Sequence, residues 1–251
     1  MKPPSLSIRI YAGLVILLAG LGALNVFLPQ GEFIAQIPTE RMPASSPVMA
    51  LVTGLGILLL YGGLGYLGLS LSTRLNFTPI WDKTITPKQR LGVPLVVGLI
   101  MGIGFILLDA ILSHFHQMGP LMHPPFPTSV VASFSAAIGE ELIFRLVFIA
   151  FWVWLISQVM LQGRARTQVF WVVVMFSAIG FTFSHFPSVM VLYGGSVMSA
   201  LPAAMIIELF LLNGSLSVVA AYYFWEVGFL GAVMVHLGAD LMWHVVWGLL
   251  S

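Results

Sequence analysis

The chain has 251 residues, of which 59% are hydrophobic and only 8% are charged, and it carries a formal net charge of +1 and no cysteine. A soluble domain usually has about a quarter charged residues, so this chain has too few to coat a water-facing surface. The small net charge excludes the basic surface that nucleic acid requires, and the lack of cysteine excludes disulfides and thiolate chemistry.

Apolar runs of about 20 residues, long enough to cross a bilayer, recur along the chain. They predict an all-α, polytopic bundle of transmembrane helices in a lipid bilayer. We expect the spans at residues 8–28, 47–72, 91–113, 128–161, 168–185, 197–223 and 228–250. The first run is long for a signal peptide and is interpreted as a retained helix. A break at Asn213-Gly214 in the sixth run would raise the count from seven spans to eight.

Lys and Arg in short loops indicate which side of the membrane each loop faces. The segment 73–90 contains four such residues and the loop 162–167 contains two, so both are expected in the cytoplasm together with the N-terminus. The connections 114–127 and 184–196 contain neither Lys nor Arg and are expected outside. The charges therefore predict a consistent topology for seven spans.

The fourth run contains three charged residues, Glu140, Glu141 and Arg145. Inserting a charged residue at the centre of a membrane helix costs about 2.5–3.5 kcal/mol on insertion scales, so each of the three is expected to have a structural or functional role. Glu141 precedes Arg145 by one helical turn, in the favourable order for an ion pair, which predicts a structural pair. Glu140 lies about 100° around the helix and has no partner nearby in sequence. A functional role is favoured for Glu140.

Two later runs also carry ionisable residues. The fifth run ends at His185, which taken alone is more typical of the membrane interface. The last run has His236 and Asp240 one turn apart on one helix face. Such a pair can hold a metal or a water, the Asp can fix the tautomer of the His, or the two can form a packing hydrogen bond worth about 1 kcal/mol. With Glu140, these residues can deprotonate a water and stabilise an oxyanion, the minimum for amide hydrolysis.

Three motifs follow one another on successive predicted helices: Glu-Glu-x-x-x-Arg at 140–145, Phe-x-x-x-His at 181–185 and His-x-x-x-Asp at 236–240. In this order they resemble the CPBP intramembrane metalloprotease family, which includes CAAX prenyl endopeptidases and prokaryotic relatives linked to bacteriocin processing. The resemblance covers about residues 128–247. It implies a catalytic helical core at 128–251, preceded by about three membrane helices at 1–127.

The resemblance also implies an activity, that of a CAAX protease-like intramembrane endopeptidase of the glutamate type or the metal-dependent type. By resemblance, Glu140 and His185 activate the attacking water, His236 with residue 240 binds the oxyanion, and Phe181 packs against the site. The expected catalytic residues are Glu140, Glu141, Arg145, His185, His236 and Asp240, with Glu141 and Arg145 shaping the site.

Asp240 departs from the Asn that many CAAX-cleaving relatives have at this position. An ionised Asp has no proton to donate to an oxyanion. Asp240 is therefore either protonated, or orients His236, or helps to bind a metal. Zinc accepts the ligand types of Glu140, His185, His236 and Asp240, so zinc is the cofactor that this set would fit.

The expected substrate is a peptide or lipidated peptide in the membrane, and the expected location is a prokaryotic cell membrane. Two other functions compete with proteolysis. Buried carboxylates and histidines also form proton relays, which would suit a proton-coupled transporter, although the sequence shows no internal inverted repeat. A catalytically idle member could instead act as a scaffold that binds another membrane protein.

Some ionisable residues fall outside the motifs. Asp109 lies near the end of its run, where a carboxylate would reach the interface. Glu208 is central in its run and is expected to line the same cavity or to pair with Arg145. The loop 114–127 carries three histidines and several prolines, and it is interpreted as a flexible polar loop rather than a metal site.

Overall fold

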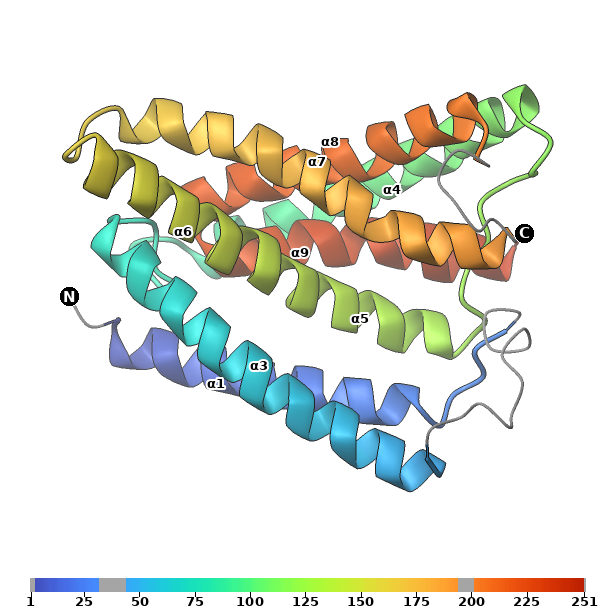
Figure 1. Ribbon diagram of the computed structural model, residues 1–251, viewed down its shortest axis with the longest axis horizontal. Helices are drawn as coiled ribbons and strands as arrows, with labels where there is room; N and C mark the ends of the chain where they lie inside the picture. The colour runs from blue at the N-terminus through green and yellow to red at the C-terminus, as the bar shows by residue number, and fades with distance from the viewer. Residues whose placement is uncertain (1–2, 32–43, 194–200, 251) are drawn as a thin grey trace.

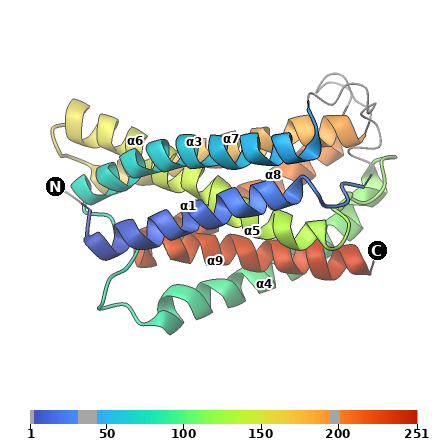
Figure 2. The same ribbon diagram turned by 90° about the horizontal axis from the view of Figure 1, so that it is seen from below.

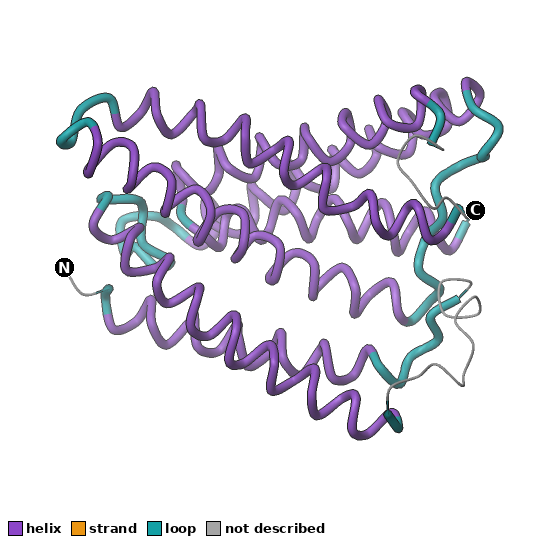
Figure 3. The backbone as a smooth tube through the Cα atoms, in the orientation of Figure 1, coloured by secondary structure: helices purple, strands orange, loops and turns teal. Residues whose placement is uncertain are grey.

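The computed structural model describes residues 3–31, 44–193 and 201–250, and within these residues it contains helices and no strand (Figures 1 and 3). Seven helical stretches are long and apolar enough to cross a membrane. They span Ser5–Asn25, Ser46–Arg74, Lys88–Phe115, Thr128–Met160, Arg166–Met190, Ala203–Val227 and Phe229–Leu249. The predicted class, an all-α multi-pass membrane protein, is confirmed.

The sixth stretch is a single helix, α8 (Ala203–Val227), which passes through Asn213 without a break. The amide Nδ2 of Asn213 donates to the carbonyl of Leu209, 3.0 Å away and one turn back. Because backbone groups in a bilayer must be satisfied within the helix, a break here would be costly. The count in the described residues is seven, and the start of the predicted run, 197–200, lies outside them.

The two ends of the bundle differ in charge. The segments 74–90 and 161–166, which carry six Lys and Arg residues, lie at the end that holds the N-terminus. The loop 116–127, which carries none, lies at the end that holds the C-terminus (Figures 1 and 2). Opposite termini are what an odd number of crossings requires. The direction of the bundle across the membrane stays a prediction from the loop charges.

The last helix, α9 (Phe229–Asp240), lies inside the bundle. It packs against α4 (Val93–Leu112), α8 and α5 (Thr128–Glu141), while α1 (Ser5–Asn25) and α3 (Ser46–Arg74) pair with each other and cover α5 and its continuation (Figure 2). Helix α7 (Arg166–Leu192) packs against α8. Since α4 contacts α9 extensively, the first three spans are not a separate body, and the division of the chain at residue 127 stays a prediction.

Glycines bring α4 and α9 close together. A methyl group built on Gly98 would overlap the backbone carbonyl of Val235, and one on Gly238 would overlap the carbonyl of Leu95. Small residues of this kind let two membrane helices approach to backbone contact. The contact fixes the position of α9, which carries His236 and Asp240.

We expect Gly98→Ala to destabilise the protein by about 1–3 kcal/mol, because the added methyl has no space and must push α4 and α9 apart. Thermal unfolding in detergent measures this effect. Gly104→Ala in the same helix is the matched control, since nothing among the described residues lies within 4 Å of a methyl group there. Equal unfolding temperatures for the two variants would contradict the close contact.

Two helices change their winding directly after a carboxylate. Beyond Glu141, α5 continues into a π-helical segment, η4 (Leu142–Ile149), and then into α6 (Ala150–Val153) and η5 (Trp154–Met160). Beyond Asp240, α9 continues as the π-helical segment η7 (Leu241–Val246). Wider π turns inside α-helices are frequent at functional sites. Both changes of winding lie next to residues of the candidate site.

Candidate active site

A cavity of about 380 Å³ lies between α5, α7, α8 and α9. Four of the residues that sequence analysis selected line it: Glu140, His185, His236 and Asp240. Leu121, Met122 and Pro124, from the loop between α4 and α5, also line the cavity at the C-terminal end of the bundle. The fold therefore brings together side chains from three helices and places them near one end of the bundle.

Glu140 is the carboxylate that faces this cavity. Its side chain is 34% exposed, and its Oε2 lies 3.7 Å from Nε2 of His185 and 4.0 Å from Nε2 of His236. These distances exceed a direct hydrogen bond, and within the described residues Oε2 has no partner. A water placed among the three atoms can bridge them.

His185 presents a defined nitrogen to Glu140. Its Nδ1 lies 2.8 Å from the carbonyl oxygen of Phe181, which can only accept a hydrogen bond. The proton of the neutral ring is therefore on Nδ1, and Nε2 carries a lone pair toward Glu140. The ring of Phe181 packs against both histidines, and its centroid lies 4.9 Å from that of the His185 ring and 5.8 Å from that of the His236 ring.

His236 lies between two carboxylates and is only 3% exposed. Its Nδ1 donates to Oε1 of Glu141 at 2.8 Å, and its Nε2 lies 3.5 Å from Oδ2 of Asp240. The sequence pointed to the Asp240 contact, because the two residues are one turn apart. It did not reveal that Glu141, which is 95 positions away, also holds the ring.

Glu141 and Arg145 form the ion pair that their spacing predicted. Nε of Arg145 lies 2.9 Å from Oε2 of Glu141, and both side chains are fully buried. The guanidinium also donates to the carbonyl of Ser217 on α8 at 3.1 Å and lies over the ring of Phe181 on α7 at 5.1 Å. Arg145 thus connects the fourth span to both neighbouring helices and balances the carboxylate that orients His236.

The arrangement does not provide a ready zinc site. In the described part of the chain, no group of three or more His, Asp or Glu side chains is placed to hold a metal ion. The Nδ1 atoms of His185 and His236 are occupied by Phe181 and Glu141, so only their Nε2 atoms face Glu140. Each histidine therefore has one ring nitrogen left for a partner in the cavity.

Glu208 and Asp109 differ from their expected roles. Oε2 of Glu208 lies 3.1 Å from Nε2 of His116, and both side chains are fully buried. Among the described residues Glu208 therefore pairs with His116 rather than with Arg145. It does not line the cavity. Asp109 is 1% exposed rather than interfacial, and it accepts the backbone N–H of Leu121 at 3.0 Å. The segment after α4 brings His116 to Glu208 and the N–H of Leu121 to Asp109. The spacing of these residues in the sequence could not reveal either contact.

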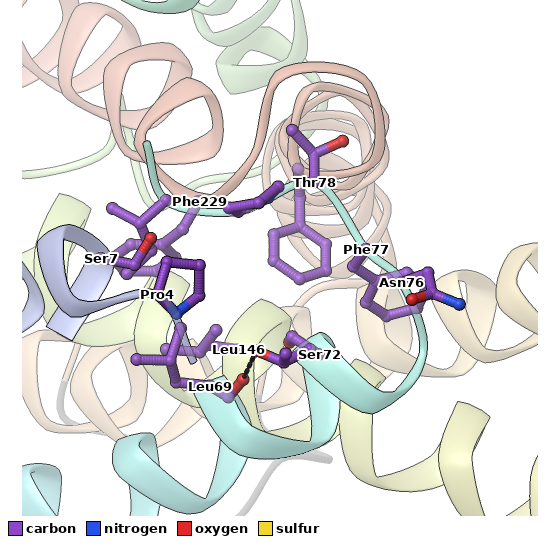
Figure 4. A pocket seen from close by; sticks show the side chains of 13 residues that line it. Pro4, Ser7, Leu69, Ser72, Asn76, Phe77, Thr78, Leu146 and Phe229 are labelled. Carbon is purple, nitrogen blue, oxygen red and sulfur yellow. Dashed lines mark hydrogen bonds between the residues drawn. The ribbon is translucent and has the colours of Figure 1, made fainter. Parts of the chain in front are cut away.

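A second cavity, of about 290 Å³, lies near the start of α1, the end of α3 and the start of α9 (Figure 4). It is lined by apolar and polar uncharged side chains such as Leu69, Phe229, Ser7 and Ser72, and no charged side chain of the described residues lines it. The residues selected from the sequence lie elsewhere. The chemistry of the site is therefore assigned to the first cavity.

The comparisons with known proteins bear on the same part of the chain. Residues 122–242 match the family model described as type II CAAX prenyl endopeptidase Rce1-like. The matched segment begins in the loop over the cavity and ends two positions after Asp240, so it includes all three motifs. No curated protein and no solved structure matches the chain.

Proposed function

We propose that the protein is an intramembrane endopeptidase that uses a water activated by Glu140 and His185. The match of residues 122–242 to the Rce1-like family model, described as a type II CAAX prenyl endopeptidase, supports this proposal. One observation carries the proposal. Oε2 of Glu140 faces the two histidine Nε2 atoms at 3.7 and 4.0 Å, which is too far for direct bonds and suitable for a shared water.

The proposed reaction begins with proton transfer from this water to Oε2 of Glu140, while the lone pair on Nε2 of His185 accepts a hydrogen bond from the O–H that remains. The hydroxide attacks the carbonyl carbon of the scissile bond, and the carbonyl oxygen becomes an oxyanion. Glu140 then passes its proton to the leaving nitrogen, and the C–N bond breaks to give a carboxylic acid and an amine. A positioned base of this kind contributes about 10²–10⁴-fold to the rate.

In the same proposal, His236 stabilises the oxyanion. Its ring, protonated between the carboxylates of Glu141 and Asp240, donates Nε2–H to the developing charge. One donor of this kind is worth about 10²–10³ in kcat. Asp240, whose ionised carboxylate can only accept, acts by holding His236 rather than by contacting the oxyanion.

We propose a peptide or lipidated peptide as the substrate, reaching the cavity within the membrane. Leu209, Leu212 and Leu216 give the α8 wall an apolar surface, while Asn213 adds an amide on the same helix. A segment with apolar side chains and one accessible peptide bond fits such a wall. A prokaryotic cell membrane is the location that the sequence resemblance favours.

The test is cleavage in proteoliposomes that carry the purified protein. Prenylated and unprenylated peptides are added, products are identified by mass spectrometry, and internal pH is followed with a trapped dye. We expect cleavage by the wild type and none by Glu140→Gln. Proton flux that depends on Glu140, without any cleavage, would instead identify a proton-coupled transporter.

A further inference from the structure

A third histidine lines the active-site cavity, one turn beyond Asp240. His244 lies in η7 and shares the cavity wall with Asp240 and His236, at successive four-residue intervals along the same helix. It lies outside the three motifs, and the reaction described above does not use it. Because it lines the same cavity as the proposed reacting groups, we consider which hydrogen bonds it can make there.

His244 contacts a second histidine from the loop over the cavity. Its Nδ1 lies 3.1 Å from Nδ1 of His123, so one ring must donate its proton and the other must accept. Burial and the nearby His244 lower the pKa of His123 to about 4, so at neutral pH His123 carries one proton. The pair therefore has only two arrangements, one for each donor.

The surroundings of His123 select between these arrangements. Its Nε2 is buried and has no hydrogen-bond partner among the described residues. If His123 accepted at Nδ1, its proton would be on this Nε2, and a buried N–H without an acceptor is rare. His123 therefore donates through Nδ1–H, and its Nε2 keeps a lone pair. It follows that His244 accepts at Nδ1 and carries its proton on Nε2.

Nε2–H of His244 is then a donor in the wall of the cavity without a side-chain partner among the described residues. Within the described residues, the one side-chain hydrogen bond of His244 is the contact of its Nδ1 with His123. Asp240, the nearest site residue on the helix, can only accept hydrogen bonds when it is ionised. His244 can therefore supply a hydrogen-bond donor to this side of the cavity, where Asp240 cannot.

We propose, in a step that rests on the proposed function, that His244 donates Nε2–H to the carbonyl oxygen of the scissile peptide and to the oxyanion derived from it. His123 is the positioning residue, since it fixes the tautomer of His244 through the Nδ1 contact. The competing explanation is that the two histidines only fasten the loop to the end of the last helix.

Kinetics of three variants separates the two explanations. We expect His244→Leu to lower kcat by about 10²–10³ with little change in KM, because the donor acts on the oxyanion. His244→Gln keeps an N–H near the same place and should lose less than about tenfold. His114→Leu is the matched control, since His114 is exposed and its Nδ1 contacts the carbonyl of Ala110 in its own helix. Thermal unfolding confirms that each variant is folded.

A folded His244→Leu protein with the kcat of the wild type would overturn the proposal. Equal losses of kcat for His244→Leu and His244→Gln would also overturn it. If the histidine only fastened the loop, the N–H that glutamine keeps would make no difference to kcat.

Nitrogen-15 NMR of histidine-labelled wild type in nanodiscs tests the tautomer without any substrate. We expect His244 with Nε2 protonated and Nδ1 bare, and His123 with the opposite pattern. In His123→Leu, His244 should become a mixture of tautomers. A proton on Nδ1 of His244 in the wild type would refute the assignment even if peptides are cleaved. Absence of cleavage with the expected tautomer would refute the proposed function, and with it the contact of His244 with a scissile peptide, while the tautomer assignment itself would stand.

Discussion

Glu140→Gln is expected to lower kcat for peptide cleavage by about 10²–10⁴, the range that a positioned general base contributes. Glutamine has the same size and keeps hydrogen-bonding atoms in the cavity, but it cannot take a proton from the water between Glu140 and His185. The side chain is 34% exposed, and the described histidines nearest to it lie beyond direct hydrogen-bond distance, so its charge contributes little to folding. The unfolding temperature should therefore stay close to that of the wild type.

Cleavage in proteoliposomes and thermal unfolding in detergent together measure this effect. Glu226→Gln is the matched control, because Glu226 is an exposed carboxylate at the other end of α8 and does not line the active-site cavity. We expect this variant to cleave like the wild type. If Glu140→Gln cleaves as fast as Glu226→Gln, Glu140 is not the base.

Arg145→Met is expected to destabilise the protein by about 3–5 kcal/mol, the cost of leaving a buried charge without its partner. Glu141 is fully buried, and its Oε2 has Arg145 as its ion-pair partner at 2.9 Å. The substitution also removes the bond to the carbonyl of Ser217 and the contact with Phe181, so two helix contacts weaken. Reversible unfolding in mixed detergent micelles measures the loss.

The double variant Glu141→Gln/Arg145→Met should recover most of this stability, because no uncompensated charge is left. The glutamine introduced there would still offer an amide oxygen to Nδ1 of His236, so the ring can keep its orientation. Arg164→Met, an exposed arginine in the loop before α7, is the control and should change stability by less than about 0.5 kcal/mol. The structural role of the pair is wrong if Arg145→Met costs no more than this control.

The fold could be predicted almost completely from apolar runs. Hydropathy over about 20 residues is a local property, and only helices or closed barrels satisfy the backbone in lipid, so each run specifies one helix. Helix ends were less well determined, since the structure places the third span at Lys88–Phe115 rather than 91–113. The break proposed at Asn213-Gly214 was wrong, because an interrupted helix would expose backbone polar groups to lipid. The same requirement explains why each apolar run predicts one helix.

Within the site, pairs one turn apart could be predicted. Glu141 with Arg145 and His236 with Asp240 follow from helix geometry alone, and the structure shows both contacts. The resemblance of the three motifs added the expectation that Glu140 and His185 act together. Their catalytic roles stay predictions until the variants are measured.

Three contacts could not be predicted, and each joins residues far apart in the chain. They are Glu141 with His236, His116 with Glu208, and His123 with His244. Which face of one helix meets which face of another depends on side-chain packing over the whole bundle, such as the glycine contact that fits α4 against α9. No spacing in the sequence encodes that alignment.

The sequence by itself determined the membrane class, a count of seven or eight spans, the local ion pair and the ionisable residues whose burial needs an explanation. Those properties depend on composition and on neighbours within one turn. The tertiary structure alone decided that Glu141 contacts both Arg145 and His236, and that His123 of the loop contacts His244 in the cavity. These features depend on how the helices pack, because packing brings together groups that the chain keeps nearly a hundred residues or more apart.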